Sequence, residues 1–423
     1  MTQGPALTPP PLTNDCFAMP RGTHWTPVDD ALDHLRQNLH GVTATETIAT
    51  SDALGRVLAV APTAIRSHPP AANSAVDGYG FAHSPDQNGA TILPLHPGRS
   101  AAGVPFDGSV PAGHALRILT GAILPAGVDT VILEEDVNTD GTQIAFQGPL
   151  KKGANCRDAG EDITQGQHIL APGRVLTPGD LGTLTAVGIA DVTVQKRLRV
   201  GVLSTGDELR KPGEMADLGH VYDANRPMLQ ALVMQWGYDV CDLGIAPDDN
   251  THLRAILNDG AAQCDVILTS GGASAGDEDH MSRLLRETGS MQLWRIAMKP
   301  GRPLALGLWD NVPVFGLPGN PVAAIVCALI FARPALSVLS GAAWISPQGF
   351  DVPAAFTKTK KQGRREYLRA RIRNGRVETF PSEGSGRVSG LSWAEGLVEL
   401  GDEAQHIEQG QLVRFIPFRS FDL

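Results

Sequence analysis

The stretch VILTSGGASAGDEDH, residues 266–280, decides the fold prediction because it joins an apolar strand pattern to a glycine-rich, acidic loop. The apolar run at its start predicts a buried strand. The glycines allow tight bends that turn backbone N–H groups toward an anion, and the acidic side chains offer oxygen ligands to a divalent cation. The loop residues of interest are Gly271, Gly272, Ser274, Gly276, Asp277 and Asp279. The stretch therefore predicts an anion and metal site at the carboxyl end of a strand.

The flanking sequence, residues 197–340, alternates strand patterns with helix patterns. Repeated β–α–β units predict a mainly parallel, doubly wound sheet with helices on both faces and ligand loops at the strand carboxyl ends. The expected strands are 199–204, 239–243, 265–269, 304–308 and 312–315, and the expected helices are 227–236, 251–262, 281–287 and one that starts at Pro321.

The rest of the chain divides into three further domains and a terminal segment. Residues 1–22 are Pro-rich and polar, which predicts a disordered N-terminus without a cleaved leader. We expect a discontinuous N-terminal domain from 23–61 and 156–196, with an amphipathic helix at 27–40 and a short helix at 51–60. Residues 62–155 predict a β-rich domain, and residues 341–423 a small C-terminal β-barrel. The predicted fold class is thus α/β multidomain.

Composition limits the partners and the compartment of the protein. The 423 residues carry a net charge of −10, which argues against nucleic acid and against an anionic membrane surface. The five cysteines have no C-x-x-C spacing, which favours reduced thiols in a cytoplasmic protein. The longest apolar run, residues 322–332, is too short for a bilayer of ~30 Å.

Two more loops follow expected strands of the α/β domain and should meet the first one in space. Asp207 and Glu208 come directly after a glycine in the first, as carboxylates aimed at a ligand would; a helix cap is the alternative. In the second, residues 317–321, backbone N–H groups at a helix start favour an anion, although an ordinary proline-initiated helix has the same pattern.

A cationic segment, residues 295–303, lies between these loops in the sequence. Prolines on both sides stiffen it and fix Lys299 relative to Arg302, which suits an oxyanion. A solvated surface face is the alternative for any charge cluster. Acidic loops beside a cationic clamp predict metal-assisted chemistry on a phosphate ester or an inorganic oxyanion.

The chain resembles the molybdopterin molybdenumtransferase family from about residue 24 to 418. The likeness is carried in register by NSAVDGYGF (73–81), RILTGAILPAGVDTVILEED (117–136), GEDI (160–163), STGDEL (204–209), VYDANRPML (221–229), LTSGGASAGDED (268–279), AMKPGRP (297–303), LPGNPVA (317–323), GRREYLRA (363–370) and GSGRVSGLSWAEGL (384–397).

The resemblance implies that adenylyl-molybdopterin and molybdate react with Mg²⁺ to give molybdenum cofactor and AMP. It also implies a homodimer of four-domain subunits, with the active cleft between the α/β domain of one subunit and the β-rich domain of the other. Transient contacts with molybdopterin adenylyltransferase and with molybdoenzyme chaperones are a further expectation.

Residue roles follow from motif position only. The metal would be held by Glu208 and Asp279, with Asp207 and Asp277 nearby. The nucleotide and pterin phosphate pocket would involve Asp248, Gly271, Gly272 and Ser274. Lys299, Arg302, Arg364 and Ser385 would bind molybdate or the dithiolene end. Further substrate contacts would come from Thr205, Gly206, Arg295, Pro318 and Asn320, and Asp77, Thr120 and Asp162 would complete the site from the other subunit.

Some positions depart from the family pattern. Arg302 and Arg295 stand where the family often has lysine, which keeps the charge and changes the hydrogen-bond geometry. His280 follows the second aspartate where an aromatic residue is common, and Val76 replaces a methionine. Two alternatives remain: a molybdopterin adenylyltransferase, which would match only the α/β domain, and a non-catalytic scaffold of the same family.

Overall fold

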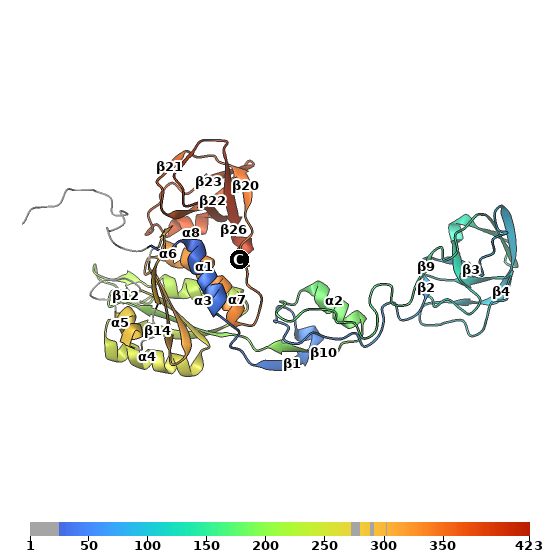
Figure 1. Ribbon diagram of the computed structural model, residues 1–423, viewed down its shortest axis with the longest axis horizontal. Helices are drawn as coiled ribbons and strands as arrows, with labels where there is room; N and C mark the ends of the chain where they lie inside the picture. Colours follow the sequence, from blue (N-terminus) through green and yellow to red (C-terminus); the bar gives the residue numbers. More distant parts are fainter. Residues whose placement is uncertain (1–24, 272–279, 288–291, 302) are drawn as a thin grey trace, which may run out of the picture. The chain divides into compact units, whose positions relative to one another are not determined.

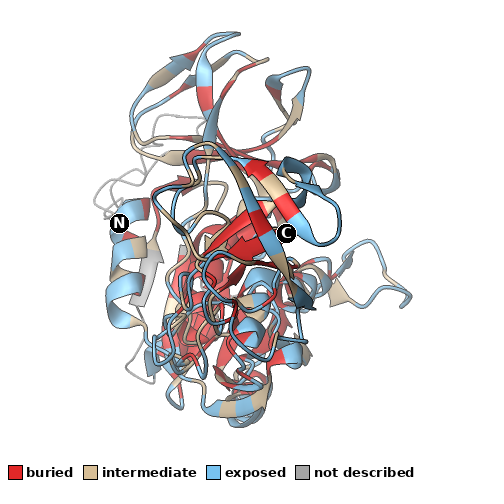
Figure 2. Cartoon of the chain, turned by 90° about the vertical axis from the view of Figure 1, so that its right-hand side faces the viewer, coloured by how far each residue is buried: buried red, intermediate tan, exposed pale blue. Residues whose placement is uncertain are grey.

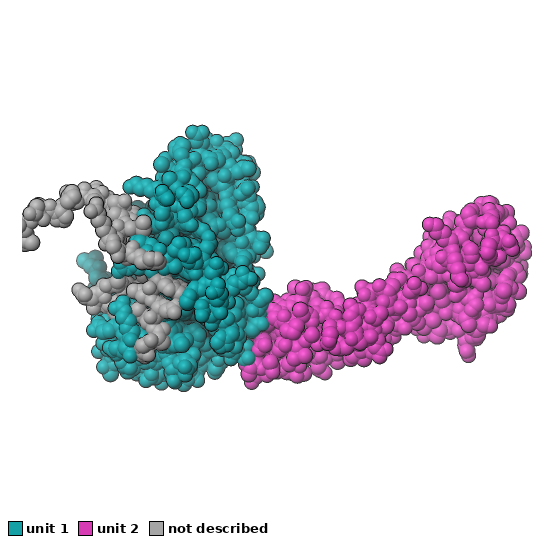
Figure 3. Space-filling view, viewed as in Figure 1, with its two compact units in different colours: residues 1–43, 197–423 teal, residues 44–196 magenta. Residues whose placement is uncertain are grey.

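The structure is a computed structural model that describes residues 25–271, 280–287, 292–301 and 303–423. It forms two compact units, one made of residues 1–43 and 197–423 and the other of residues 44–196 (Figure 3). The terminal segment 1–22, predicted to be disordered, lies outside the described residues.

A six-stranded sheet forms the centre of the α/β domain in the first unit (Figure 1). Its order is β14 (Asp239–Ala246), β11 (Arg199–Thr205), β15 (Val266–Ser270), β19 (Val312–Leu317), β18 (Pro303–Trp309) and β16 (Gln292–Arg295). The first four strands are parallel, and the last two are antiparallel to their neighbours. Every residue of β15 is buried, as its unbroken apolar run requires of a central strand.

Helices cover both faces of this sheet, which confirms the predicted doubly wound arrangement. One face packs against α1 (Val28–Asn38), α3 (Asn225–Gln235), and the continuous stretch α6 (Pro321–Cys327), η3 (Ala328–Ala332) and α7 (Arg333–Leu339). The other face packs against α4 (Asn250–Gln263) and α5 (His280–Glu287). Figure 2 colours the chain by burial, with buried residues in red and exposed ones in pale blue.

Helix α1 belongs to the α/β domain and not to the discontinuous domain in which the sequence had placed it. Val28 and Leu35 on its apolar face are completely buried in the same core as β11 and α3. Asp29 on its first turn is bound by the guanidinium of Arg365 through two hydrogen bonds of 2.7 Å. The amphipathic pattern located the helix correctly, but a pattern does not say which sheet its apolar face covers.

The apolar run at 322–332 is part of a longer helix than the sequence indicated. Residues Pro321–Leu339 form 19 residues of helix, long and apolar enough to cross a membrane by length and composition, with 89% of the tested window buried inside the protein. Arg333 is buried within this stretch, where Tyr238 accepts a hydrogen bond from it at 3.0 Å and Asp422 pairs with its charge. This burial identifies the stretch as a core helix of the first unit.

The C-terminal domain is a curled sheet of β17 (Met298–Lys299), β22 (Arg365–Arg373), β24 (Gly396–Leu400), β26 (Leu412–Pro417) and β20 (Phe350–Pro353), with β23 (Arg376–Thr379) beside β22. A bridge between Ala354 and Val377 closes the sheet into a small barrel, in agreement with the sequence. The domain also holds β21 (Lys358–Lys360), β25 (Gln405–Ile407) and α8 (Ser389–Trp393).

The second unit has a mixed part and a β-rich part. The mixed part pairs β1 (Thr45–Ala49) with β10 (Asp191–Gln195) beside α2 (Pro178–Ala186). The helix expected at 51–60 is wrong: only a 3₁₀ turn, η1 (Thr50–Asp52), forms there. Gly55 has φ 72°, and Val57 and Leu58 bridge to Val175 and Val194 in extended geometry.

The β-rich part contains a six-stranded sheet and a two-stranded one. The order of the larger sheet is β6 (Thr130–Leu133), β3 (Gly78–Phe81), β5 (Ala115–Ile118), β4 (Ala90–Ser100), β8 (Gln143–Gln147) and β7 (Asn138–Thr139). The smaller sheet pairs β2 (Asn73–Ser74) with β9 (Cys156–Arg157). Its core is formed by Phe81, Ile132, Ile144 and their neighbours.

Candidate active site

Two acidic loops meet where β11 and β14 end. The amide of Asp207 donates to a carboxylate oxygen of Asp248 at 3.3 Å, and the amide of Asp248 donates to the carboxylate of Asp207 at 3.1 Å. This reciprocal pair holds both side chains at the carboxyl edge of the sheet. The amide of Gly206 adds a bond of 3.2 Å to the carbonyl of Ala246. The structure therefore brings together three residues that the family motifs had selected.

Glu208 folds back over the backbone of its own loop. A Cβ atom placed on Gly206 would lie 2.4 Å from Oε2 of Glu208, and the φ of Gly206 is 150°. Any larger residue at 206 would force the carboxylate away. Asp207 and Glu208 are both exposed, and among the described residues no cation forms an ion pair with either of them. Their charge is available to a ligand.

The glycine-rich loop begins close to the first acidic loop. A Cβ atom on Gly271 would lie 2.7 Å from the carbonyl oxygen of Thr205 and 2.8 Å from its hydroxyl, and φ is 93°. The amide of Gly271 donates to Leu317 at 3.2 Å, so the ends of β11, β15 and β19 converge. Gly272, Ser274, Asp277 and Asp279 lie outside the described residues.

A buried asparagine ties this edge together, and the sequence analysis did not single it out. The side-chain amide of Asn225 donates to the hydroxyl of Ser270 at 2.6 Å and to the carbonyl of Gly319 at 2.7 Å. Asn225 stands in the VYDANRPML motif, which was the available signal. At the same edge, Oδ1 of Asn320 accepts from the amide of Val322 at 3.2 Å and caps α6.

A cationic cavity of about 240 Å³ lies between the α/β domain and the C-terminal domain of the first unit. Strand β17 pairs with β22, with Lys299 opposite Glu366, and so carries the cationic segment to the C-terminal domain. The cavity gathers five of the expected substrate-binding residues, which are Lys299, Pro318, Asn320, Arg364 and Ser385. Its other lining residues are Met298, Pro300, Gly301, Ala323 and Glu383.

Internal carboxylates pair with Lys299 of this cavity and with Lys358, which lines a neighbouring cavity. Nζ of Lys299 lies 2.5 Å from Glu383 and 3.9 Å from Glu366. Lys358 pairs with the same two carboxylates, at 3.0 Å from Glu366 and in close contact with Glu383. Burial raises the pKa of Glu383, but hydrogen bonds from Lys299 and Lys358 outweigh it and hold the pKa below its usual value. Burial lowers the pKa of Lys358, but the two carboxylates outweigh it and raise the pKa overall.

Two of the expected cations do not line the cavity in the described structure. Arg295 ends β16, where its carbonyl accepts from Thr26 at 2.9 Å, and it is not among the lining residues. Arg302 lies outside the described residues. Lys358 and Glu383 were not selected from the sequence, because nothing in KTKK or PSEGSG distinguishes them from solvated surface charges.

Three expected residues lie in the second unit. The carboxylate of Asp77 accepts from the backbone amide of Thr120 at 2.6 Å and from its hydroxyl at 2.7 Å, and these bonds lower the pKa of Asp77. Asp162 lies on another loop, where its amide donates to His68 at 3.2 Å. The structure thus joins Asp77 to Thr120, and no contact between described residues joins Asp162 to them.

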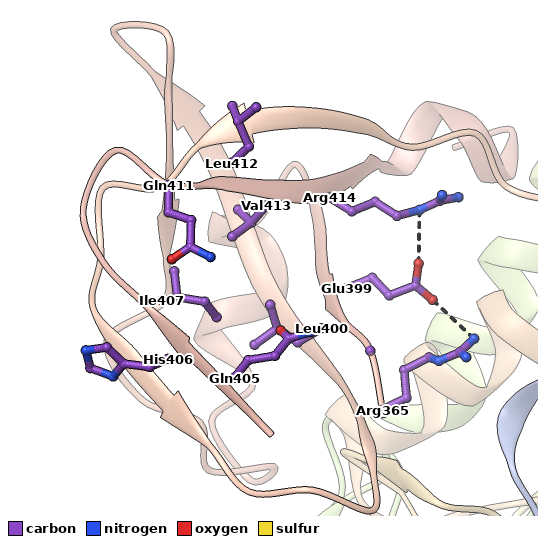
Figure 4. Close-up of a pocket in the computed structure, with 11 residues that line it drawn as sticks. Arg365, Glu399, Leu400, Gln405, His406, Ile407, Gln411, Leu412, Val413 and Arg414 are labelled. Carbon is purple, nitrogen blue, oxygen red and sulfur yellow. Dashed lines mark ion pairs between the residues drawn. The ribbon is translucent and has the colours of Figure 1, made fainter. Parts of the chain in front are cut away.

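A larger cavity, of about 530 Å³, lies in the C-terminal domain and contains none of the expected residues. Figure 4 shows Glu399 between Arg365 and Arg414, at 3.7 Å and 3.0 Å from their nitrogen atoms. Asp29 and Asp402 also pair with Arg365. These three carboxylates outnumber the two arginines, so the cavity has no excess positive charge for an anionic ligand.

The described residues contain no group of three or more His, Cys, Asp or Glu side chains that is arranged to hold a metal ion. Mg²⁺ is usually held by one or two carboxylates together with water and substrate phosphates. The exposed Glu208, with Asp207 and Asp248 beside it, fits that smaller requirement. The carboxylates of Asp277 and Asp279 are outside the part of the chain that the structure describes.

Three family models match successive parts of the chain. They are the MoeA N-terminal region (domain I and II) at residues 26–188, a probable molybdopterin binding domain at 201–338, and the MoeA C-terminal region (domain IV) at 351–418. A molybdopterin molybdenumtransferase of Haemophilus influenzae is 35% identical over 92% of this chain and 98% of its own length. The chain belongs to the molybdopterin molybdenumtransferase family.

Other members of this molybdopterin molybdenumtransferase family agree with that assignment. Molybdopterin molybdenumtransferase 2 of Mycobacterium tuberculosis is 32% identical over 86% of this chain and 93% of its own length. A solved structure of the molybdopterin biosynthesis MoeA protein from Pyrococcus horikoshii has a TM-score of 0.81 at 26% identity, and covers 93% of this chain and 100% of that one. The likeness spans all domains.

Proposed function

We propose that this protein is a molybdopterin molybdenumtransferase that inserts molybdate into adenylyl-molybdopterin and releases AMP. The observation that carries the proposal is the cationic cavity, because it collects Lys299, Arg364 and Ser385 next to the edge where the strand loops end. Cations and hydroxyl groups fixed in one cavity suit a tetrahedral oxyanion. The family models match regions on both sides of the α/β domain, which disfavours an adenylyltransferase of that domain alone.

The chain's own residues would bind and position the two substrates. Backbone N–H groups at the start of α6 would face the phosphates. Lys299 and Arg364 would hold molybdate at the dithiolene end and balance its charge during transfer. A cysteine nucleophile is not needed: burial raises the pKa of Cys327 to about 12 and, with help from Cys241, that of Cys264 to about 12.

We propose that Mg²⁺ is held by Glu208, with Asp207 nearby and with Asp277 and Asp279 from the adjacent loop. When bound, it would neutralise the phosphoanhydride and the leaving AMP. Support comes from the exposed carboxylates of Asp207 and Glu208 and from Thr205 of the same loop, which lies against Gly271.

We also propose a homodimer that acts in the cytoplasm. The family resemblance supports a site completed by Asp77, Thr120 and Asp162 of the partner subunit. The hydrogen bonds that orient Asp77 on Thr120 support a functional carboxylate at that position. The reduced cysteines agree with a cytoplasmic location.

The test is AMP release by the purified full-length protein with adenylyl-molybdopterin, molybdate and Mg²⁺. The proposal expects AMP only when all components are present. The variant Lys299→Gln should lower the rate by about 10²-fold, the usual effect of removing one donor to a developing charge. The matched control is Lys152→Gln, since Lys152 is 72% exposed and pairs with Asp129 at 3.5 Å outside the cavity. Molybdate-independent AMP release by the wild type would contradict the proposal.

A further inference from the structure

Glu383 bridges Lys299 of the cationic cavity and Lys358 of a neighbouring cavity. One carboxylate oxygen lies 2.5 Å from Nζ of Lys299, and the other is in close contact with Nζ of Lys358. An oxyanion bound by the same two ammonium groups would place its oxygen atoms where the oxygens of Glu383 now lie. The carboxylate therefore occupies an anion position in the resting protein.

The two carboxylates that face these lysines differ in how firmly they are held. Glu366 lies within β22, and its side chain is only 10% exposed. Glu383 lies on an irregular loop before Gly384, and its side chain is 43% exposed. Because nearly half of the Glu383 side chain already contacts solvent, its carboxylate can turn outward, whereas that of Glu366 is enclosed beside β22. Glu366 is therefore the fixed counterion of the two lysines, and the carboxylate of Glu383 is the one that can turn away from them.

Arg369 fixes the backbone of the loop that carries Glu383. Its guanidinium donates to the carbonyls of Arg387 at 2.5 Å, Ser382 at 2.6 Å and Gly384 at 3.1 Å. Arg369 itself is only 4% exposed and lies 4.8 Å from the centre of the Phe380 ring. With the backbone held at residues on both sides, the side chain of Glu383 can turn without the loop being displaced.

The bridge stands between two cavities. The cationic cavity of about 240 Å³ and a second one of about 210 Å³ both include Lys299, Pro300 and Glu383 in their linings. The second cavity adds Lys358 and Arg369. Removal of the carboxylate from this position would leave space with cations on both sides.

We propose that Glu383 is a built-in counterion that occupies the oxyanion position between Lys299 and Lys358 and is displaced when the oxyanion substrate binds. This inference rests on the proposed function, in which that substrate is molybdate, and it adds Lys358 to the binding residues. Molybdate carries two negative charges and replaces a carboxylate that carries one. The exchange favours doubly charged oxyanions and disfavours singly charged ones.

The test is molybdate binding to the full-length protein by titration calorimetry, with Glu383→Gln compared with the wild type. The substitution keeps the shape and removes the competing charge. The dissociation constant should fall about three- to tenfold, a modest effect because the ion pair is partly exposed. The matched control is Glu395→Gln: Glu395 is 50% exposed and pairs with Arg373 at 2.7 Å outside both cavities. That control should bind like the wild type.

Two results would overturn the inference. An unchanged or larger dissociation constant in Glu383→Gln, with an unchanged melting temperature, would mean that the carboxylate supports the site and does not compete for it. Absence of molybdate binding to both proteins would mean that the lysine pair is not an oxyanion site. AMP release measured in parallel separates the cases, since wild-type release that depends on molybdate leaves the proposed function standing when the inference fails.

Discussion

The acidic edge of the sheet and the cationic cavity are both rich in charge, but they balance it in opposite ways. Asp207 and Asp248 accept hydrogen bonds from each other's amides, and Glu208 lies over Gly206, without a cation paired to any of them among the described residues. The cationic cavity and its neighbour, in contrast, pair Lys299 and Lys358 with Glu366 and Glu383. We therefore proposed that the edge binds an external cation, and that the lysines exchange one anion for another.

The largest effect should come from the acidic edge. Glu208→Gln should lower AMP release by about 10³-fold, because the carboxylate proposed to hold Mg²⁺ is lost and metal-ion stabilisation supplies several kcal/mol. Molybdate binding measured separately should not change. Chelation of divalent cations should reproduce both results in the wild type. The control Glu214→Gln, an exposed residue of the same segment, should keep full activity. A loss of molybdate binding in Glu208→Gln would contradict the assignment of separate roles to the acidic edge and the cationic cavity.

The buried Arg369 should have the next largest effect, on stability. Arg369→Met keeps the side-chain length but leaves the carbonyls of Ser382, Gly384 and Arg387 without their donor. We expect a loss of about 2 kcal/mol in the free energy of unfolding, measured by denaturant titration. The Michaelis constant for molybdate should rise as well, because the loop that carries Ser385 loses its anchor. Arg369→Lys should recover part of both losses, and equal losses in the two variants would argue against this role.

A substitution of Lys358 tests the role proposed for this lysine in binding molybdate. Lys358→Gln should raise the Michaelis constant for molybdate about tenfold and change the maximal rate little, as expected when one charge-assisted hydrogen bond to a bound anion is lost. The double variant Lys358→Gln with Glu383→Gln should be less affected than the sum of the single changes predicts. Additive effects would show that the two residues do not share one anion position.

The smallest effect should come from Asp29, a carboxylate that pairs with Arg365 and does not compete for Lys299 or Lys358. Asp29 forms two hydrogen bonds of 2.7 Å with Arg365, and these bonds lower the pKa of Asp29. Because the side chain is 66% exposed, screening limits the loss in Asp29→Asn to about 0.5 kcal/mol. A lowered folded-state pKa means that this stability is present above a pH of about 3.9 and is lost as the pH falls through the folded pKa.

Unfolding free energies measured across that pH range should therefore converge for Asp29→Asn and the wild type at low pH. Molybdate binding should be the same in both proteins at neutral pH. A gain in molybdate affinity equal to that of Glu383→Gln would show a general charge effect and would remove the special role of Glu383.

The sequence predicted the parts of the fold that depend on local pattern. Fully apolar runs such as Val266–Leu268 identified the central strands, and alternation with helices predicted ligand loops at the strand carboxyl ends. Predictions from local pattern were wrong where pairing with a distant segment of the chain determined the secondary structure. The segment 51–60 has helical spacing, but Gly55 at φ 72° and the bridges of Val57 and Leu58 make it extended.

The candidate site was predictable only in part for a similar reason. The acidic loops follow strands directly, so neighbouring strands bring Asp207 and Asp248 together. Lys299 and Arg364 come together because β17 pairs with β22. No residue spacing in the sequence predicts this short pairing. Glu383 was missed because an exposed glutamate in a glycine-rich loop has the same sequence signature whether it contacts water or two lysines.

The central claim is that an oxyanion binds between Lys299 and Lys358, and anomalous diffraction at the molybdenum edge from crystals grown with molybdate tests it most directly. The account predicts a molybdenum peak between Lys299 and Lys358, where the cavity lined by Arg364 and Ser385 meets its neighbour, with the carboxylate of Glu383 turned away from both lysines. A cavity without molybdenum, in which Glu383 still bridges Lys299 and Lys358 at saturating molybdate, would contradict it.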